Sequence, residues 1–446
     1  MSMKRILSAL MAFVLLISVL SPAASCLDFR TGNRQNVLFD QVDRDSLDLN
    51  LFSDGISQDL KVEKLEDHDV VKIFIIMDDP SVLEQNSAAV YGDDTKALMD
   101  SLSAGQDELI ATIETDILGG QALDISYRYT WLLNGIAAEV TCETLRKIEK
   151  LPGVKQVLLQ PQYEACTSSF DTKPVADTYT ISTGTMINRD PVWASGYTGA
   201  GITIAVIDTG LDADHQNFQA LPQEKLTEDS VDASHVASVL EELNAFDRMG
   251  GLTAEALYHS TKVVYGFNYA DNNLDITHDN DIMGDHGTHV AGIAAANKVA
   301  ESEVVGVAPD AQLYIMKVYG ADHGGYAEDI MAALEDALML GADVVNMSLG
   351  TNAGFTTSTE EVNAIYNRVA ETNTVLCVAA GNNYTAGYDN TWGTNANQTK
   401  YPDNAVIGEP AVYNNVLSVA SVENWFIQRN YIAAGDKKLA FVETSA

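Results

Sequence analysis

The sequence predicts an α/β fold: a parallel sheet with helices on both faces, preceded by a small α+β domain. In the second half of the chain, short apolar runs alternate with helical patterns, which is typical of parallel sheets that helices cover on both sides. In the first half, the order strand, helix, strand, strand, helix, strand is that of a split βαβ sandwich of the ferredoxin-like type. A chain of 446 residues is long enough for two or three domains with a large core.

The N-terminus has the features of a secretion signal. Two basic residues precede an apolar run at 6–20, which is too short to span a bilayer comfortably, and small residues follow up to Ser25. We therefore expect residues 1–25 to be a signal peptide and the protein to be secreted or to stay at the cell envelope. Cys26 follows Ala-Ala-Ser, which loosely resembles a lipoprotein box. Membrane attachment is expected only through such a lipid anchor or a wall anchor.

The small α+β domain is expected at residues 69–166, after a polar and irregular stretch at 26–68 that we interpret as a linker. Its longer helix has apolar residues at three- and four-residue steps. An Asn-Gly pair at 134–135 is typical of a hairpin turn, and a Pro-Gly pair at 152–153 ends the second helix. The strands are expected at 70–77, 125–133, 136–140 and 154–159, and the helices at 87–117 and 141–151.

The parallel sheet is expected within residues 190–425. Inside this range, residues 217–262 look like an insertion with a helical, acidic middle around 230–244. The alternating patterns predict strands at 202–207, 312–318, 344–347, 375–379 and 416–419, and helices at 289–297 and 326–340.

Composition argues against one class of partner. The formal net charge is −37, whereas a protein that binds nucleic acid needs basic surface to contact phosphates. We therefore expect no nucleic-acid partner and interpret the charge as favouring solubility. The four cysteines, at 26, 142, 166 and 377, are too few and too scattered for a disulfide framework.

Asp208 closes the first apolar strand of the expected sheet and is followed by Thr209-Gly210. Ligands gather at the carboxyl ends of strands in open α/β sheets. A buried carboxylate there can orient an imidazole and stabilise its charged form. Taken alone, an Asp-x-Gly sequence is equally typical of a turn.

His286 opens a run of small residues, Gly-Thr-His-Val-Ala-Gly-Ile-Ala-Ala-Ala, which lets a helix sit tightly inside a core. A His on the first turn of such a helix can act as a general base if an Asp meets one ring nitrogen and a Ser the other. We expect His289, three residues on, to be a buried packing residue. The His-Glu-x-x-His pattern of metalloproteases is absent, so we expect no metal in the site.

Three loops complete the candidate site. Asn382, in Ala-Ala-Gly-Asn, could donate to a developing oxyanion, although a turn after Gly is the alternative. Two strips could pair main chain to main chain with an extended peptide, although each strip alone is only a loop. They consist of Gly324 and Gly325, and of Ser348, Leu349 and Gly350.

Five motifs stand in order along the chain: Asp-Thr-Gly (208–210), His-Gly-Thr-His-Val-Ala-Gly (286–292), Gly-Val-Ala-Pro (306–309), Asn-Met-Ser-Leu-Gly (346–350) and Ala-Ala-Gly-Asn (379–382). In this order they resemble the subtilisin-like serine proteases, or subtilases, over roughly residues 190–425. The resemblance implies a subtilisin-like sheet and peptide-bond hydrolysis by an Asp-His-Ser triad. It also implies that Asp208 is the orienting acid, His286 the general base and Asn382 the oxyanion donor.

Residues 70–165 resemble the inhibitory propeptide of subtilases, particularly at 133–137 and 151–154. The resemblance therefore implies a zymogen, in which this domain templates folding and blocks the cleft as an intramolecular inhibitor. Protein or peptide substrates are the other implied partners. The processing site is expected between about Cys166 and Pro191.

A closer resemblance lies in Tyr-Gly-Phe-Asn-Tyr-Ala-Asp-Asn-Asn (265–273), Gly-Ala-Asp-Val-Val-Asn-Met-Ser-Leu-Gly (341–350) and Ser-Val-Ala-Ser-Val-Glu-Asn (418–424). These segments are similar to the cell-envelope proteinases of Gram-positive bacteria, the lactocepin type. In such proteins a protease-associated domain is inserted before the nucleophile. Residues 426–446 look like the entry to such an insertion.

The family's nucleophile segment, of the Gly-Thr-Ser-Met-Ala type, does not occur in the 446 residues. Ser445 in Glu-Thr-Ser-Ala superficially resembles this segment, but Glu stands where the tight turn needs Gly, and the following Met is missing. We expect truncation to explain this and the serine to lie beyond residue 446. The polypeptide is therefore expected to be inactive. The alternative function is that of a non-catalytic, peptide-binding fragment or pseudoprotease.

The resemblance implies no cofactor for the chemistry, although structural calcium is common in the family. The acidic cluster at 279–285 does not fit the EF-hand pattern, because Met283 and Val290 occupy two ligand positions. We therefore interpret the cluster as a solvated loop beside His286.

Overall fold

The computed structural model describes residues 66–165, 179–278, 281, 284–300, 304–351, 360–381, 407–421, 430–434 and 437–441. By its contacts the chain divides into Met1–Asp69 and Val70–Ala446, and every helix and strand named below belongs to the second unit. The expected signal peptide, at 1–25, and most of the expected linker lie outside the described residues. The domain boundaries inferred from the sequence stay predictions.

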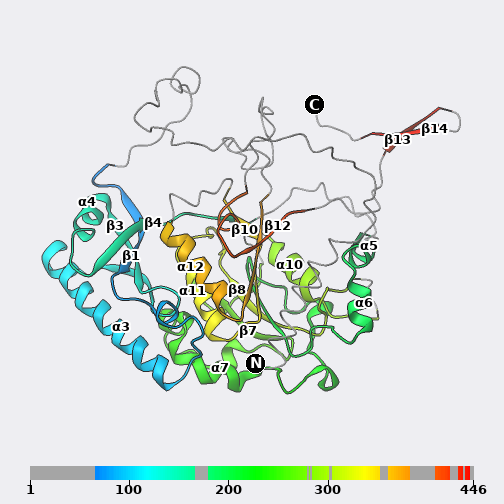
Figure 1. Cartoon of the computed structure of the whole chain (residues 1–446), viewed down its shortest axis with the longest axis horizontal. Coiled ribbons are helices and arrows are strands. Elements are labelled where there is room, and N and C mark those ends of the chain that lie inside the picture. The colour runs from blue at the N-terminus through cyan, green and yellow to red at the C-terminus, as the bar shows by residue number, and fades with distance from the viewer. Residues whose placement is uncertain are drawn as a thin grey trace, which may run out of the picture. The chain divides into compact units, whose positions relative to one another are not determined.

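The first part of the described chain has the predicted order of a split βαβ sandwich (Figure 1). Its elements are β1 (Val70–Met77), α2 (Val82–Gln85), α3 (Asp93–Thr112), β2 (Asp124–Tyr129), β3 (Gly135–Thr141), α4 (Cys142–Ile148) and β4 (Val154–Leu159). The four strands are antiparallel, in the order β2-β3-β1-β4. Leu109 of α3 and Ile148 of α4 share one core cluster with Ile73 and Ile75 of β1, so both helices cover the same face of the sheet.

The longer helix starts later than the sequence predicts. α3 begins at Asp93 instead of residue 87, because Gly92 forms the N-terminal cap, and its N–H donates to Thr95 Oγ1 at 2.8 Å. The predicted last turn is present as a π-helical turn at Ile113–Ile117.

The Asn-Gly pair does not form the predicted hairpin turn, and the strand before it ends at Tyr129. Tyr129 pairs with Gly135, so a longer loop connects the two strands. In that loop the N–H groups of Leu132 and Leu133 donate to Oε1 of Glu335, at 2.5 and 3.3 Å. A distant carboxylate therefore fixes the loop, and no local turn preference contains that information.

The second sheet consists of parallel strands, as predicted, with helices that follow them (Figure 1). Its order is β12-β11-β9-β6-β8-β7, with bounds β6 (Thr203–Asp208), β7 (Val263–Asn268), β8 (Gln312–Lys317), β9 (Val344–Met347), β11 (Val375–Ala379) and β12 (Leu417–Val419). The main helices are α10 (His286–Ala295), α11 (Ala327–Met339) and α12 (Glu360–Glu371). The sequence patterns missed β7 and α12; Gly266 inside β7 weakens its strand signal.

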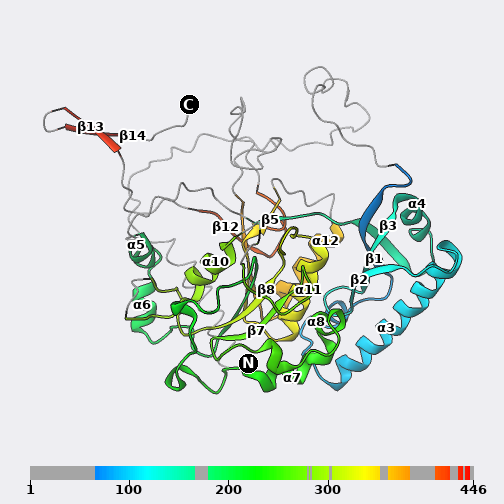
Figure 2. The ribbon, with the colours of Figure 1, turned by 180° about the vertical axis from the view of Figure 1, so that it is seen from behind.

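Helices cover both faces of the parallel sheet, as predicted. Side chains of a strand alternate between faces. Ile204 and Val206 of β6 pack in one cluster with Ala291 of α10, whereas Ala205 and Ile207 pack in another with residues of α11 and α12. Figures 1 and 2 show α10 on one side of the strands and α11 and α12 on the other. Because the helices cover the two faces of the sheet, a site can form at the carboxyl ends of the strands.

The remaining elements are short. The expected insertion at 217–262 contains helices, as predicted from its acidic middle. The short helices of the whole chain are α5 (Tyr179–Met186), α6 (Arg189–Ala194), α7 (Ala233–Val239), α8 (Asn244–Arg248) and α9 (Ala254–Leu257), with 3₁₀ turns at Gln216–Phe218, Gln223–Lys225 and Leu240–Glu242. The short strands are β5 (Glu164–Ala165), β10 (Leu349–Gly350), β13 (Asn430–Ala434) and β14 (Lys437–Phe441). β13 and β14 form an antiparallel pair, and their assignment to a protease-associated insertion stays a prediction. Among the described residues, no helix is both long and apolar enough to cross a membrane.

Candidate active site

The structure brings Asp208 and His286 together at the carboxyl edge of the parallel sheet. β6 ends at Asp208, and α10 begins at His286. The imidazole Nδ1 lies 2.7 Å from the carboxylate Oδ1, a hydrogen bond in which the ring nitrogen donates. The Asp208 side chain is 1% exposed and that of His286 is 13% exposed. A buried acid thus fixes one nitrogen of a ring that keeps some access to solvent.

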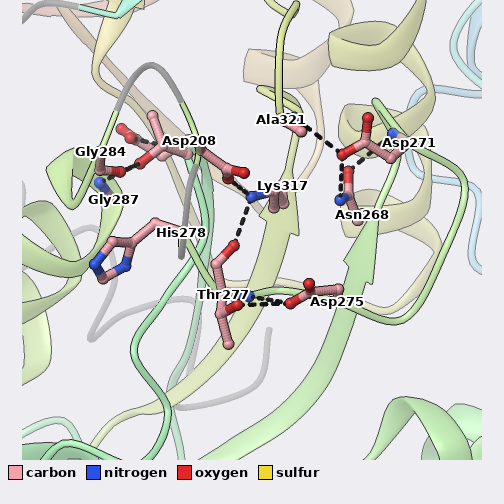
Figure 3. Close-up of polar contacts among 12 residues, drawn as sticks. Asp208, Asn268, Asp271, Asp275, Thr277, His278, Gly284, Gly287, Lys317 and Ala321 are labelled. Carbon is pink, nitrogen blue, oxygen red and sulfur yellow. Dashed lines mark hydrogen bonds and ion pairs between the residues drawn. The ribbon is translucent and has the colours of Figure 1, made fainter.

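The glycines of the two motifs allow strand and helix to meet. A Cβ on Gly287 would lie 2.4 Å from the carbonyl oxygen of Gly210. Gly210 has φ +106°, and a Cβ there would lie 2.3 Å from the carbonyl oxygen of Ile276. Thr209 Oγ1 accepts from Gly287 N–H at 2.8 Å and donates to the Gly284 carbonyl at 3.1 Å. Figure 3 shows Gly284 and Gly287 beside Asp208. The segments around Asp208 and His286 are therefore packed backbone to backbone.

One expectation near His286 is wrong, and a second fails at one residue, since Asp285 of the same acidic cluster is exposed as expected. His289, on α10, is exposed instead of buried. Asp281, in the cluster expected to be solvated, has a side chain only 7% exposed and forms an ion pair with Lys317. Within the part of the chain that the structure describes, no group of three or more His, Cys, Asp or Glu side chains could hold a metal ion.

Both predicted peptide-pairing strips contact one extended segment of this chain. β5 pairs antiparallel with β10, so that Ala165 lies opposite Leu349 and Glu164 opposite Gly350. Ser348 precedes β10, and its Oγ accepts from the Asn346 side-chain amide at 3.1 Å. The strips therefore hold a strand in the way that main-chain recognition of a peptide requires.

The second strip contacts the same segment from the other side. Tyr163 N–H donates to the Gly325 carbonyl at 2.7 Å, and the Gln162 side-chain amide donates to the Gly324 carbonyl at 2.9 Å. Gly325 has φ +70°, and a Cβ there would lie 1.9 Å from the Tyr163 carbonyl oxygen. The glycines are therefore needed for this close approach.

Sequence reasoning missed two residues at this edge. Tyr319 donates its hydroxyl proton to the Tyr163 carbonyl at 3.3 Å. Lys317 ends β8 beside Asp208, and its side chain is 2% exposed. A lysine directly after the largely apolar run at 313–316 is the sequence signal that could have identified Lys317.

Some predicted positions lie outside the described residues. These include Asn382, the candidate oxyanion donor, and Ser445. β11, which leads toward Asn382, ends at Ala379 as predicted, and Gly381 follows with φ +100°. The role of Asn382 stays a prediction.

Comparisons with known proteins identify the family of the chain. The profile of the Subtilase family matches residues 199–444. A PII-type proteinase of Lacticaseibacillus paracasei is 33% identical over 321 residues, which are 70% of this chain and 15% of that protein. Subtilisin DY of Bacillus licheniformis is 29% identical over 239 residues, which are 54% of this chain and 63% of that protein. The chain thus spans only a small part of the first relative's length.

A solved structure aligns over most of the chain. Fervidolysin from Fervidobacterium pennivorans, a keratinolytic enzyme related to subtilisin, covers 84% of this chain and 46% of its own, with 16% identity and a TM-score of 0.45. That similarity is too low to support an argument about function. The sequence matches confirm the resemblance inferred from the motifs. Since the Subtilase profile matches more than half of the 446 residues, the chain belongs to the subtilase family.

Proposed function

We propose that this chain carries the acid and the base of a secreted serine endopeptidase that is made as a zymogen. The observation that carries the proposal is the 2.7 Å hydrogen bond between Asp208 and His286. It lies at the sheet edge where the strips at Gly325 and Leu349 hold an extended segment. A base, its orienting acid and a peptide-binding edge therefore occupy one end of the same sheet.

In the proposed reaction, His286 takes the hydroxyl proton of a serine through Nε2 as the serine oxygen attacks the peptide carbonyl. Asp208 holds Nδ1 and stabilises the imidazolium that results. His286 then gives the proton to the leaving amine, and water releases the acyl group by the same steps. Asn382 is the proposed donor to the oxyanion. This chemistry requires no cofactor, and its substrates are proteins or peptides.

The zymogen part of the proposal is supported by the segment that occupies the strips. Residues 162–165 directly follow the four-stranded sheet, and they run between Gly325 and Leu349. A peptide substrate would need the same main-chain groups. We therefore propose that the domain at 69–166 is an inhibitory propeptide, removed by cleavage between about Cys166 and Pro191.

Export follows from the N-terminal pattern of the sequence. We propose that residues 1–25 direct the chain out of the cytoplasm, with release or attachment at the cell envelope as the outcome. A lipid on Cys26 is the proposed route to attachment.

The alternative function is that of a non-catalytic, peptide-binding protein. The observation in its favour is that the two strips already hold residues 162–165 through main-chain contacts. The strips at Gly325 and Leu349 would then serve only to hold a strand. The two functions differ in whether a reactive serine ever meets His286.

Labelling with a serine-directed fluorophosphonate separates them. We expect the 446-residue polypeptide to remain unlabelled, because Ser445 lacks the surrounding residues that a nucleophile needs. A form of the protein that includes a nucleophile segment is expected to label and to hydrolyse peptides. Ser445→Ala is the control and should change nothing. Stoichiometric labelling that this substitution removes would identify Ser445 as the nucleophile, and an unreactive longer form would favour the binding function.

Gly325→Ala tests how residues 162–165 are held. The new Cβ would overlap the Tyr163 carbonyl, so we expect the Tyr163 N–H to lose at least tenfold of its protection against hydrogen exchange, measured by mass spectrometry. Gly341→Ala is a matched control, because Gly341 has φ +72° and open space around a Cβ. Equal protection of Tyr163 in both variants would contradict the proposed docking.

A further inference from the structure

Three polar side chains stand in a row at the carboxyl edge of the sheet. Asp208 pairs in register with Lys317, and Lys317 pairs with Asn268. The residues that precede them, Ile207, Met316 and Phe267, all pack in the cluster that contains α11. Because side chains alternate along a strand, Asp208, Lys317 and Asn268 all point to the opposite face, where α10 and His286 lie.

Lys317 uses this position to hold the loop between β7 and α10. Its Nζ donates to the Thr277 carbonyl at 2.5 Å and forms an ion pair with Asp281. Figure 3 shows the Lys317 side chain turned toward Thr277, between Asp208 on one side and Asn268 on the other. Both partners of the ion pair are largely buried, with side chains 2% and 7% exposed. Because both side chains are buried, leaving the charge of Lys317 or of Asp281 without its partner would be unfavourable.

The loop that Lys317 contacts leads directly to His286. It leaves β7 at Asn268 and ends where α10 begins. Near its middle, Leu211 N–H donates to the Ile276 carbonyl at 2.7 Å, and near its end Thr209 donates to Gly284. The segment that carries Asp208 thus binds the loop through its main chain and through Thr209. Lys317 binds it at two further points between these contacts.

Lys317 also packs against the Asp208 motif itself. A Cβ on Gly210 would lie 3.1 Å from Lys317 Cδ, so the aliphatic part of the lysine lies directly over this glycine. In addition, Val318 N–H donates to the Asp208 carbonyl at 2.9 Å. Lys317 itself thus contacts both Gly210, just after the strand end that bears the acid, and the loop that bears the base.

We propose that Lys317 is a positioning residue that sets His286 against Asp208 by fastening the loop at Thr277 and Asp281 to the end of β8. The proposal rests on the proposed function in so far as it calls His286 the base. Lys317 touches neither ring nitrogen in any contact described above, and it acts through the loop. Displacement of the loop would lengthen the Asp208–His286 hydrogen bond, and a shift of about 1 Å at a reacting group is enough to cost roughly 100-fold in rate.

The test follows the ring N–H of His286 by NMR in the 446-residue chain, labelled with ¹⁵N in histidine and assigned by its loss in His286→Gln. The wild type is expected to show a strongly shifted, hydrogen-bonded proton. In Lys317→Met we expect this signal to be lost. The readout needs no nucleophile, so its outcome is independent of whether the protein hydrolyses peptides.

Lys262→Met is the matched control. Lys262 is equally buried and donates to two main-chain carbonyls, of Pro309 at 3.0 Å and Ala311 at 2.7 Å, but it precedes β7 at the amino end of the strands. Its loss should lower stability in urea without changing the His286 proton. An unchanged signal in folded Lys317→Met, or an equal loss in Lys262→Met, would overturn the proposal.

A second variant covers the case in which Lys317→Met does not fold. Asp281→Asn removes the ion pair and leaves the Thr277 contact in place, so we expect the His286 proton signal to weaken by at least twofold. An unchanged signal in this variant would show that the ion pair with Asp281 does not position His286, which would contradict the proposal as stated. In a form of the protein with a nucleophile segment, both variants should lower kcat and leave KM nearly unchanged.

Discussion

Replacing His286 by Ala is expected to abolish cleavage of the N-terminal domain in a form of the protein that includes a nucleophile segment. Without the imidazole, nothing in the described site can take the serine proton. Loss of the base in a triad lowers kcat by a factor on the order of 10⁶. The measurement is the appearance of the processed form over time by gel electrophoresis and mass spectrometry, together with kcat on a peptide substrate.

Two further variants make this result specific. Asp208→Asn should keep the fold and lower kcat by about 10⁴-fold, because an amide can hold the ring in the wrong tautomer. His289→Ala is the control on the same helix: its side chain is exposed, so processing should be normal. Normal processing in His286→Ala would instead show that another protease removes the domain.

The second large effect is expected from pH, because α11 buries four carboxylates beneath the four-stranded sheet. Glu328, Asp329, Glu335 and Asp336 are all at most 6% exposed. Glu328 forms an ion pair with Lys72 and accepts from the Gln160 side-chain amide. Of the other three, Asp329 lies within the influence of Lys72 and Arg248, whereas Glu335 and Asp336 both accept from the Asn244 side-chain amide.

Each of the three acids has a raised pKa. Burial raises the pKa of Glu335 to about 8, although the N–H groups of Leu132 and Leu133 and the Asn244 side chain favour its charged form. Burial, together with the charge of Glu328, raises the pKa of Asp329 to about 8, opposed by Lys72 and Arg248. Burial raises the pKa of Asp336 to about 6, opposed by hydrogen bonds from Tyr269, Asn244 and Ala245.

The sign of the effect follows from these directions. A group whose pKa is raised by folding binds its proton more tightly in the folded state, so folding is favoured at low pH. The contribution is complete below the unfolded values of about 4 and is lost as pH rises through 6 to 8. We therefore expect the free energy of unfolding to fall between pH 5 and pH 8, by an amount on the order of 3 kcal/mol from Glu335 alone.

Urea unfolding of the 446-residue chain at pH 5, 6, 7 and 8 measures this. Glu335→Gln keeps the shape and the acceptor for Leu132 and Leu133 but cannot ionise, so its unfolding free energy should fall less steeply than that of the wild type. Subtracting the unfolding free energy of the variant from that of the wild type at each pH also cancels the contribution of Lys262, which has the opposite pH dependence. Burial lowers the pKa of that lysine to about 7, so its contribution to stability rises with pH above that value.

The control is a carboxylate in the same interface that water reaches. Glu361 forms an ion pair with Lys155 at 3.0 Å, with both side chains partly exposed. Glu361→Gln should leave the pH dependence as in the wild type. If Glu335→Gln and the wild type showed the same slope, ionisation of Glu335 would not limit the stability of this interface.

The sequence predicted most of the strands because their apolar runs are local and continuous. β1, β4, β9 and β11 have the bounds that the patterns gave. Strand β7 was not predicted, because Gly266 interrupts its apolar run. The loop after Tyr129 was predicted wrongly, because its shape depends on Glu335. Patterns of neighbouring residues carry no information about such distant partners.

By itself, the sequence determined the family and the two residues of the candidate site, since the order of short motifs around Asp208 and His286 is a property of the chain alone. Only the tertiary structure decided that these residues meet at 2.7 Å, that residues 162–165 lie between the two strips, and that Lys317 holds the loop before His286. The physical reason is that each of these contacts joins segments far apart in the chain. Their formation depends on the packing of a whole sheet, and no local preference encodes it.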